Sequence, residues 1–392
     1  MTINVLKGGR VTMKVAVCGS VLRWALQRSG RHAVIESKFP KLGEWLEDKS
    51  QPTLRQLEDL AKATATPLGY FFLSEPPDAR LPIPHFRTLG EDVAPSPNLL
   101  ETVQTMERRQ AWMREHMIEQ GYDPLPFVRS GRVTDDPRQV AREMQVVLGL
   151  TEGWAAEHPS WTAALRGLQR KSEDVGILVV VNSIVGNNTR RKLSVSEFRG
   201  FALADEYAPL VFLNGADGKA AQMFTLAHEL AHIWLGSSAA FDLRELQPAA
   251  DKVEQTCNRV AAEFLVPGDE IREIWSSVCY DSERFQRIAR RFKVSELVAA
   301  RRALDLELIA RNEFVDFYQA YLENDLRANV QDRGGGNFYA SQNLRVGRRF
   351  ANIVVRAVKE GRLLYREAYQ LTGLYGTAFS RYAEFLGFRE QA

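Results

Sequence analysis

Cysteine is scarce in this sequence, and the scarcity limits both the kind of site and the compartment that fit it. The three cysteines, Cys18, Cys257 and Cys279, are widely spaced and odd in number. They form no CxxC pair, so we expect neither a disulfide framework nor a cysteine-based metal knuckle. The simplest interpretation is a protein that stays in a reducing compartment.

Long apolar runs and a strong excess of one charge are also missing. No segment approaches the roughly 20 apolar residues that a membrane-spanning helix needs. The mildly apolar stretch 11–21 is interrupted by Lys14 and Gly19 and lacks the cleavage pattern of a secretory signal. We therefore expect a cytoplasmic protein without a membrane partner. The net charge of +2 argues neither for nor against nucleic-acid binding, and 392 residues suffice for two or three domains.

Short helices dominate the first 75 residues. Helical spacing of apolar residues and turn-forming residues predict four of them, at about 20–30, 32–39, 41–48 and 53–66. Thr53 is the expected N-cap of the fourth helix, and Pro67 ends it. Several short helices joined by tight turns are typical of a helix-turn-helix bundle. Six prolines then make residues 76–98 a stiff, extended linker that no helix crosses.

The spacing of apolar residues changes from helical to strand-like at about residue 176. The continuous apolar run 177–181 predicts a buried strand, and residues 198–203 and 210–213 predict two more. A helix starts at about Lys219, with Asp217 as its expected N-cap. Strands followed by helices indicate an α+β domain.

Helices are expected on both sides of these strands. Two precede them, at about 99–120 and 137–148, and the chain after Gly268 is mostly helical. The final section, 332–392, is basic, with 10 Lys and Arg against 5 Asp and Glu. Its arginines could contact nucleic acid or an acidic partner, or could lie on solvated helix faces.

The most informative segment is His228-Glu229-Leu-Ala-His232, which lies in a helical run. Residues four apart share one helix face, so the two imidazoles can hold one Zn²⁺ ion. Glu229 is turned about 100° away and can take a proton from metal-activated water. A chance match on an exposed helix is the alternative. The apolar flanks disfavour it, because they bury these polar groups, which then need partners, and Gly236 ends the helix soon after.

A third zinc ligand must come from elsewhere, because His232 is the last histidine in the chain. The next helix, at about 251–266, offers three carboxylates: Asp251, Glu254 and Glu263. Glu254 lies about 60° from the centre of the buried stripe and Glu263 about 120° from it. We therefore predict that Glu254 is the ligand and that Glu263 faces solvent. A surface salt bridge is the alternative role for Glu254.

These residues carry a family resemblance. The motif helix, a preceding strand that ends in Asn214, and Glu254 followed four residues later by Asn258 resemble the ImmA/IrrE family of bacterial metallopeptidases. The resemblance implies that the Glu before this asparagine, Glu254, is the third ligand. Cys257 departs from the family, which usually has alanine there.

The N-terminal section resembles the Xre-type helix-turn-helix module found fused to such peptidases, and residues 82–88 resemble a segment common in these fusions. The matching residues are Trp24, Pro40, Lys41, Trp45, Pro52, Thr53, Leu57, Leu60, Ala61, Pro67, Phe71 and Phe72. Binding to DNA stays open, because the expected recognition helix contains Glu44, Glu47 and Asp48, which phosphates repel. The alternative is a helical bundle that docks a partner protein.

Together the residues and the resemblance predict a predominantly helical α+β protein. The expected parts are an Xre-like helix-turn-helix domain (13–75), the linker (76–98), a zincin-like ImmA/IrrE peptidase domain (99–312) and a helical basic region (313–392). We expect an endopeptidase that binds one zinc ion per chain. Its substrate would be a protein regulator, either a DNA-binding repressor or a toxin from a neighbouring gene. The alternative is a non-catalytic antitoxin or DNA-binding regulator with a structural zinc.

Four other histidines, His32, His85, His116 and His158, are isolated in the sequence, and we expect structural or exposed roles for them. The sequence does not identify the group that stabilises an oxyanion. Tyr207 is a weak candidate, and ordinary packing of a turn is its alternative role.

Overall fold

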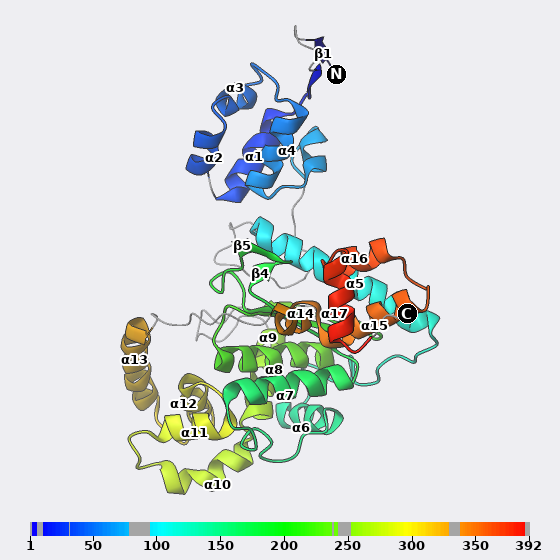
Figure 1. The fold of residues 1–392 in the computed structure, drawn as a ribbon. Helices are drawn as coiled ribbons and strands as arrows, with labels where there is room; N and C mark the ends of the chain where they lie inside the picture. The colour runs from blue at the N-terminus through cyan, green and yellow to red at the C-terminus, as the bar shows by residue number, and fades with distance from the viewer. Residues whose placement is uncertain are drawn as a thin grey trace. The chain divides into compact units, whose positions relative to one another are not determined.

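The computed structural model describes residues 2–5, 11–30, 32–77, 95–236, 239–241, 252–328 and 338–388 (Figure 1). The described residues up to Gln104 form one compact unit, and those from Thr105 form a second. Most of the expected linker lies outside the described residues.

The first unit is built from short helices, as predicted. Its elements are β1 (Thr2–Val5), β2 (Val11–Lys14), α1 (Gly19–Ser29), α2 (His32–Lys38), α3 (Leu42–Leu46), α4 (Leu54–Thr64) and the 3-10 turn η1 (Leu68–Phe72). The predicted cap of α4 is present: the Gln56 amide donates to Thr53 Oγ1 at 3.3 Å, and the Thr53 amide donates to Gln56 Oε1 at 2.8 Å. The β1–β2 hairpin was not expected from the sequence.

The second unit begins with helices that were only partly predicted. Its first helices are α5 (Pro97–Glu119, of which Thr105 onward belongs here), α6 (Pro137–Val147) and α7 (Trp161–Asp174). The sequence predicted α5 and α6 but not α7. Ser160 begins α7, because its Oγ accepts a hydrogen bond from the Ala163 amide at 3.2 Å.

A small mixed sheet forms the centre of the second unit. Its strands are β3 (Leu178–Asn182), β6 (Gly200–Leu203), β7 (Leu210–Asn214) and β8 (Ala239–Phe241), in the order β3-β7-β6-β8. β3 and β7 are parallel, and the other two pairs are antiparallel. The three predicted strands are present; β8 and the hairpin of β4 (Ile184–Val185) and β5 (Asn188–Lys192) were not predicted.

The main core lies between one face of this sheet and helix α8 (Lys219–Leu235). Val179, Val211 and Leu213 of the sheet and Leu226 and Leu230 of α8 belong to one buried cluster. α7 and α9 (Lys252–Leu265) pack against α8, so α8 is covered on several sides (Figure 1). The predicted class, α+β and predominantly helical, is confirmed.

Helices also make up the rest of the described chain. They are α10 (Gly268–Val278), α11 (Arg284–Phe292), α12 (Glu296–Asp305), α13 (Arg311–Ala328), α14 (Phe338–Val346), α15 (Arg348–Lys359), α16 (Tyr365–Thr372) and α17 (Thr377–Phe385). No described helix is both long enough and apolar enough to cross a membrane.

The corner between α14 and α15 packs on the outer edge of β3. Gly347 occupies this corner with a φ of 86°, and a Cβ there would lie 3.0 Å from the Val179 carbonyl oxygen. Glu173, at the end of α7, accepts a hydrogen bond from the Arg349 amide at 3.1 Å and so caps α15. The last helices are therefore anchored to the edge of the sheet that lies farthest from β8.

Candidate metal centre

Helix α8 carries the predicted motif through the core. The sequence predicted Asp217 as its N-cap, and that prediction was wrong: Gly218 occupies the cap position without a side-chain bond. Asp217 is drawn away because its carboxylate pairs with Arg199, at 3.0 Å between Oδ2 and Nη1. Gly236 ends the helix as expected, in the left-handed conformation with a φ of 70°.

His228 and His232 meet Glu254 of α9 inside this core. Both imidazoles are fully buried, and their Nε2 atoms are 2.9 Å apart. The two Glu254 carboxylate oxygens lie 3.2 Å from the Nε2 atoms, Oε2 from that of His228 and Oε1 from that of His232. The ligand atoms of the three residues lie within 4.8 Å of one another. The structure thus brings together the three residues that the sequence singled out.

The chemistry of this cluster fits a zinc ion. Two imidazole nitrogens and one carboxylate are a donor set that zinc accepts in sites that also hold water or substrate. Burial lowers the pKa of His228 to about 4, so its imidazole is neutral, the form that binds a metal. Burial acts to raise the pKa of the Glu254 carboxyl, but hydrogen bonds with His228 and His232 outweigh it and lower that pKa.

Glu229 lies beside this cluster but is not part of it. Its side chain is fully buried, and neither carboxylate oxygen has a hydrogen-bond partner within the described part of the chain. Burial, and then the charge of Glu254, raise the pKa of Glu229 well above its ordinary value. A buried carboxyl without a partner lowers the free energy of unfolding, so its presence needs a functional explanation.

Gly200 of β6 makes room for this carboxyl. A Cβ at Gly200 would lie 2.6 Å from Thr225 Cγ2 and 3.4 Å from Glu229 Oε1. Only glycine lets α8 approach β6 so closely without a shift. The sequence alone gave no sign of this, because the contact joins two elements that are distant along the chain.

Glu263 does not face solvent, so that prediction was wrong. Its side chain is only 12% exposed and forms an ion pair with Arg302 of α12. Its Oε1 also accepts a hydrogen bond from the Gly268 amide at 3.1 Å. The helical angle placed Glu263 off the α9 stripe correctly, but α12 covers that side of the helix. Asp251, the other carboxylate considered, lies outside the described residues.

The remaining candidates have separate surroundings. Exposed His32 pairs with Glu36, with 3.4 Å between Nδ1 and Oε1. His116 stacks on Trp112, and His158 lies edge-on to Trp154. His85 lies outside the described residues. Tyr207 belongs to the β6–β7 turn, where the Arg114 guanidinium lies 5.6 Å from the centre of its ring.

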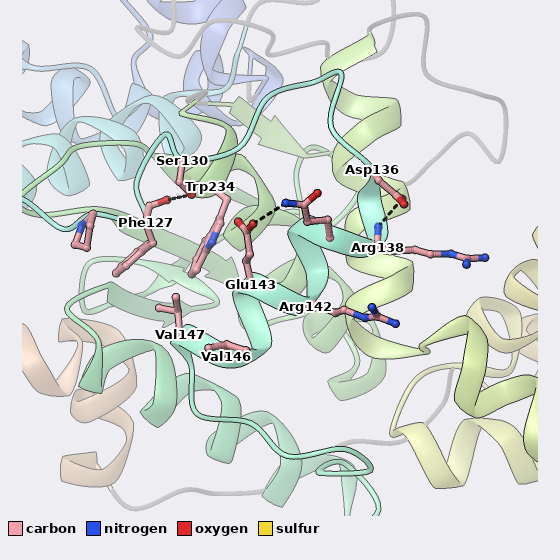
Figure 2. Close-up of a pocket in the computed structure, with 11 residues that line it drawn as sticks. Phe127, Ser130, Asp136, Arg138, Arg142, Glu143, Val146, Val147 and Trp234 are labelled. Carbon is pink, nitrogen blue, oxygen red and sulfur yellow. Dashed lines mark hydrogen bonds between the residues drawn. The ribbon is translucent and has the colours of Figure 1, made fainter.

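A separate pocket of about 830 Å³ lies beside α6. Phe127, Trp234 and Val147 are among its apolar lining residues, and Arg138 and Glu143 are among its charged ones (Figure 2). None of the three clustered side chains, nor Glu229, lines this pocket. Its size therefore does not bear on the metal centre, which is a tightly packed buried group.

Asn258 is a site residue to which the sequence assigned no role. It lies one helical turn after Glu254 on α9, and its side chain acts to raise the pKa of His228, against the larger effect of burial. Partners of this kind fix the ring orientation of a metal-binding histidine. Only the three-dimensional structure shows that Asn258 reaches His228.

Asn258→Ala is expected to lower zinc affinity about 10- to 100-fold, because the His228 ring loses a group that orients it. Competition with a fluorescent chelator measures the affinity. Arg259→Ala, at the exposed neighbouring position of the same helix, is the matched control and should bind zinc as the wild type does. Equal affinity of the two variants would show that Asn258 does not position the ring.

Comparison with known families identifies part of the chain. Residues 172–304 match the model of the IrrE N-terminal-like domain, Peptidase_M78. This segment spans His228, Glu229, His232, Glu254 and Asn258 and supports a metallopeptidase of the ImmA/IrrE type there. Residues 346–385 match a domain of unknown function, DUF8813. No curated protein matches the chain.

Proposed function

We propose that this protein is a zinc-dependent endopeptidase that cleaves a protein regulator. In this proposal His228, His232 and Glu254 bind one zinc ion, and Glu229 is the general base. The observation that carries it is the buried Glu229 carboxyl, which has no partner in the described part of the chain and lies next to a two-histidine, one-carboxylate cluster. The family match over residues 172–304 supports the same activity.

Each residue of the site has a separate role in the proposed hydrolysis. A bound zinc ion would supply the Lewis acidity that activates water and polarises the scissile carbonyl. Glu229 takes the proton of the attacking water and delivers it to the leaving nitrogen of the peptide bond. Asn258, whose side chain interacts with His228, would help to orient this ring. The surrounding core excludes bulk water, since both histidines are fully buried.

The competing function is a non-catalytic regulator with a structural zinc. Such a protein has no need for a buried carboxyl that neither binds the metal nor pairs with another group. Glu229 has these features within the described chain, and it is the observation that favours the enzyme.

Within this proposal the substrate is a DNA-binding repressor or a toxin encoded by a neighbouring gene. The setting is the bacterial cytoplasm, for which the scarcity of cysteine, three in 392 residues, is one support. The N-terminal unit would bind DNA or a partner protein. The α3 region carries Glu44 and Glu47, which respectively accept a hydrogen bond from Ser50 and pair with Lys49, and carboxylates at this position would repel phosphates.

The test is to incubate the zinc-loaded protein with the purified product of each adjacent gene and to look for a discrete fragment. Cleavage should stop when a chelator removes the metal and return when zinc is added back. Mass spectrometry of the fragments then locates the cut bond. Cleavage that persists in the metal-free protein would contradict a zinc peptidase.

A further inference from the structure

The strand that approaches the proposed general base is β6, and its side away from β7 is where a further strand can pair. Gly200 of β6 is the position whose added Cβ would come within 3.4 Å of Glu229 Oε1. The opposite edge of the four-stranded sheet, β3, is separated from β6 by β7 and is covered by the corner at Gly347. An extended peptide that must reach Glu229 therefore has one suitable edge among the described strands.

Hydrogen bonding along this edge follows from the strand register. The Asn214 amide donates to the Arg199 carbonyl at 2.8 Å, so in the antiparallel pair Phe201 and Leu203 also direct their backbone groups towards β7. The N–H and C=O groups of Gly200 and Ala202 point the other way. A peptide paired with them would lie one strand spacing, about 4.8 Å, from β6, next to the strand whose Gly200 the Glu229 carboxyl approaches.

β8 already occupies this position. It pairs antiparallel with β6, with Ala239 opposite Ala202, Ala240 opposite Phe201 and Phe241 opposite Gly200. β8 therefore uses the backbone groups of Gly200 and Ala202 that an incoming peptide would need. Pairing on the far side of β8 would move the peptide a further strand spacing, about 4.8 Å, from Glu229.

We propose that β8 is an internal occupant of the substrate edge, and that an extended strand of the substrate must displace it before cleavage. The inference rests on the proposed peptidase function and adds how the substrate binds and how the site is kept latent. Main-chain pairing of a guest strand to a sheet edge is a common mode of peptide recognition. β8 spans only three residues, so a guest strand exchanges a small number of hydrogen bonds, each with a modest net contribution.

β8 also has the advantage of being tethered. It follows α8 in the same chain, so it competes with the substrate at a high effective concentration. A free peptide therefore binds weakly, because it must compete with β8. A substrate needs additional contacts whose binding free energy exceeds the advantage that the tether gives β8. Latency of this kind needs no separate inhibitor protein.

Two zinc-directed probes separate this inference from the proposed function. Acetohydroxamate can bind a zinc ion without a peptide strand, whereas a tripeptide hydroxamate must also place its backbone along an edge. Hydrogen exchange of the zinc-loaded full chain is the first readout. With the tripeptide probe bound, we expect the Ala239 and Phe241 amides to exchange faster while the Gly200 and Ala202 amides remain slow. Acetohydroxamate should leave all four slow.

Proline variants supply the second readout. Ala239→Pro with Phe241→Pro removes the two β8 amides that face β6, whereas Ala240→Pro, the matched control, removes one that faces away. The double variant should improve the affinity for the tripeptide hydroxamate about tenfold relative to acetohydroxamate. The control should keep the wild-type ratio.

The outcomes are distinct. If the Ala239 and Phe241 amides stay slow with the tripeptide probe bound, or if the double variant keeps the wild-type ratio, β8 is not displaced and the inference is wrong. If acetohydroxamate does not bind the zinc-loaded wild type, the proposed metal centre itself is wrong, and the inference falls with it.

Discussion

Glu229→Gln is expected to slow cleavage about 10²- to 10⁴-fold while the protein keeps its zinc. Gln has nearly the same shape as Glu but cannot accept a proton at neutral pH. The side chain is fully buried beside the ligand cluster without belonging to it, so the substitution should leave the metal in place. Fragment formation from the cognate substrate gives the rate, and elemental analysis gives the zinc content.

A second buried carboxyl provides the matched control for this variant. Glu270 of α10 is 7% exposed, and burial raises its pKa as well. Glu270 does not belong to the ligand cluster, so Glu270→Gln should cleave at the wild-type rate.

The pKa of Glu229 is higher in the folded protein than in the unfolded chain. Ionisation of this carboxyl therefore lowers the free energy of unfolding as the pH rises above the pKa that Glu229 has in the unfolded chain. Metal-free Glu229→Gln should consequently be no less stable than the wild type at pH 7. Equal cleavage by wild type and Glu229→Gln would exclude Glu229 as the base.

Glu254→Ala is expected to lower zinc affinity by more than about 100-fold, which exceeds the typical effect of losing an orienting partner. Two imidazoles alone would remain to hold the ion, because both Glu254 oxygens lie against their Nε2 atoms. Competition with a chelator of known affinity measures the change, and thermal unfolding of the metal-free protein reports on the fold.

Glu263→Ala on the same helix should show the reverse pattern. Its partner Arg302 is only 9% exposed, so removing the carboxylate leaves a nearly buried cation unpaired, which typically costs about 3–5 kcal/mol. The variant should therefore unfold at a lower temperature yet bind zinc as the wild type does. If Glu263→Ala loses the metal and Glu254→Ala keeps it, the assignment of the third ligand is wrong.

The sequence predicted the part of the site that depends on helix geometry. His228, Glu229 and His232 lie within one helix, so their relative directions follow from the number of residues between them. Glu254 followed from its angle to the apolar stripe of α9. Asn258 and Gly200 could not be assigned in the same way, because their roles come from contacts between α9 and α8 and between β6 and α8.

The fold, like the site, was predicted where local sequence decides it and missed where contacts between distant residues decide it. Apolar runs identified β3, β6 and β7, which are buried in the structure. Errors arose where a distant charge decided the outcome: Arg199 takes Asp217 from its expected cap, and Arg302 holds Glu263. β8 was missed because a three-residue strand has no detectable period in a sequence.

The contacts that hold the family-matched segment extend beyond residues 172–304. Arg109 of α5, which precedes the matched residues 172–304, is buried and donates to the carbonyl oxygens of Leu371 at 2.8 Å and Arg345 at 2.9 Å. A chain that ended at residue 304 would leave this guanidinium without those acceptors. The same truncation would expose the edge of β3. The matched segment therefore packs against parts of the chain on both sides of it, α5 before it and the final helices after it.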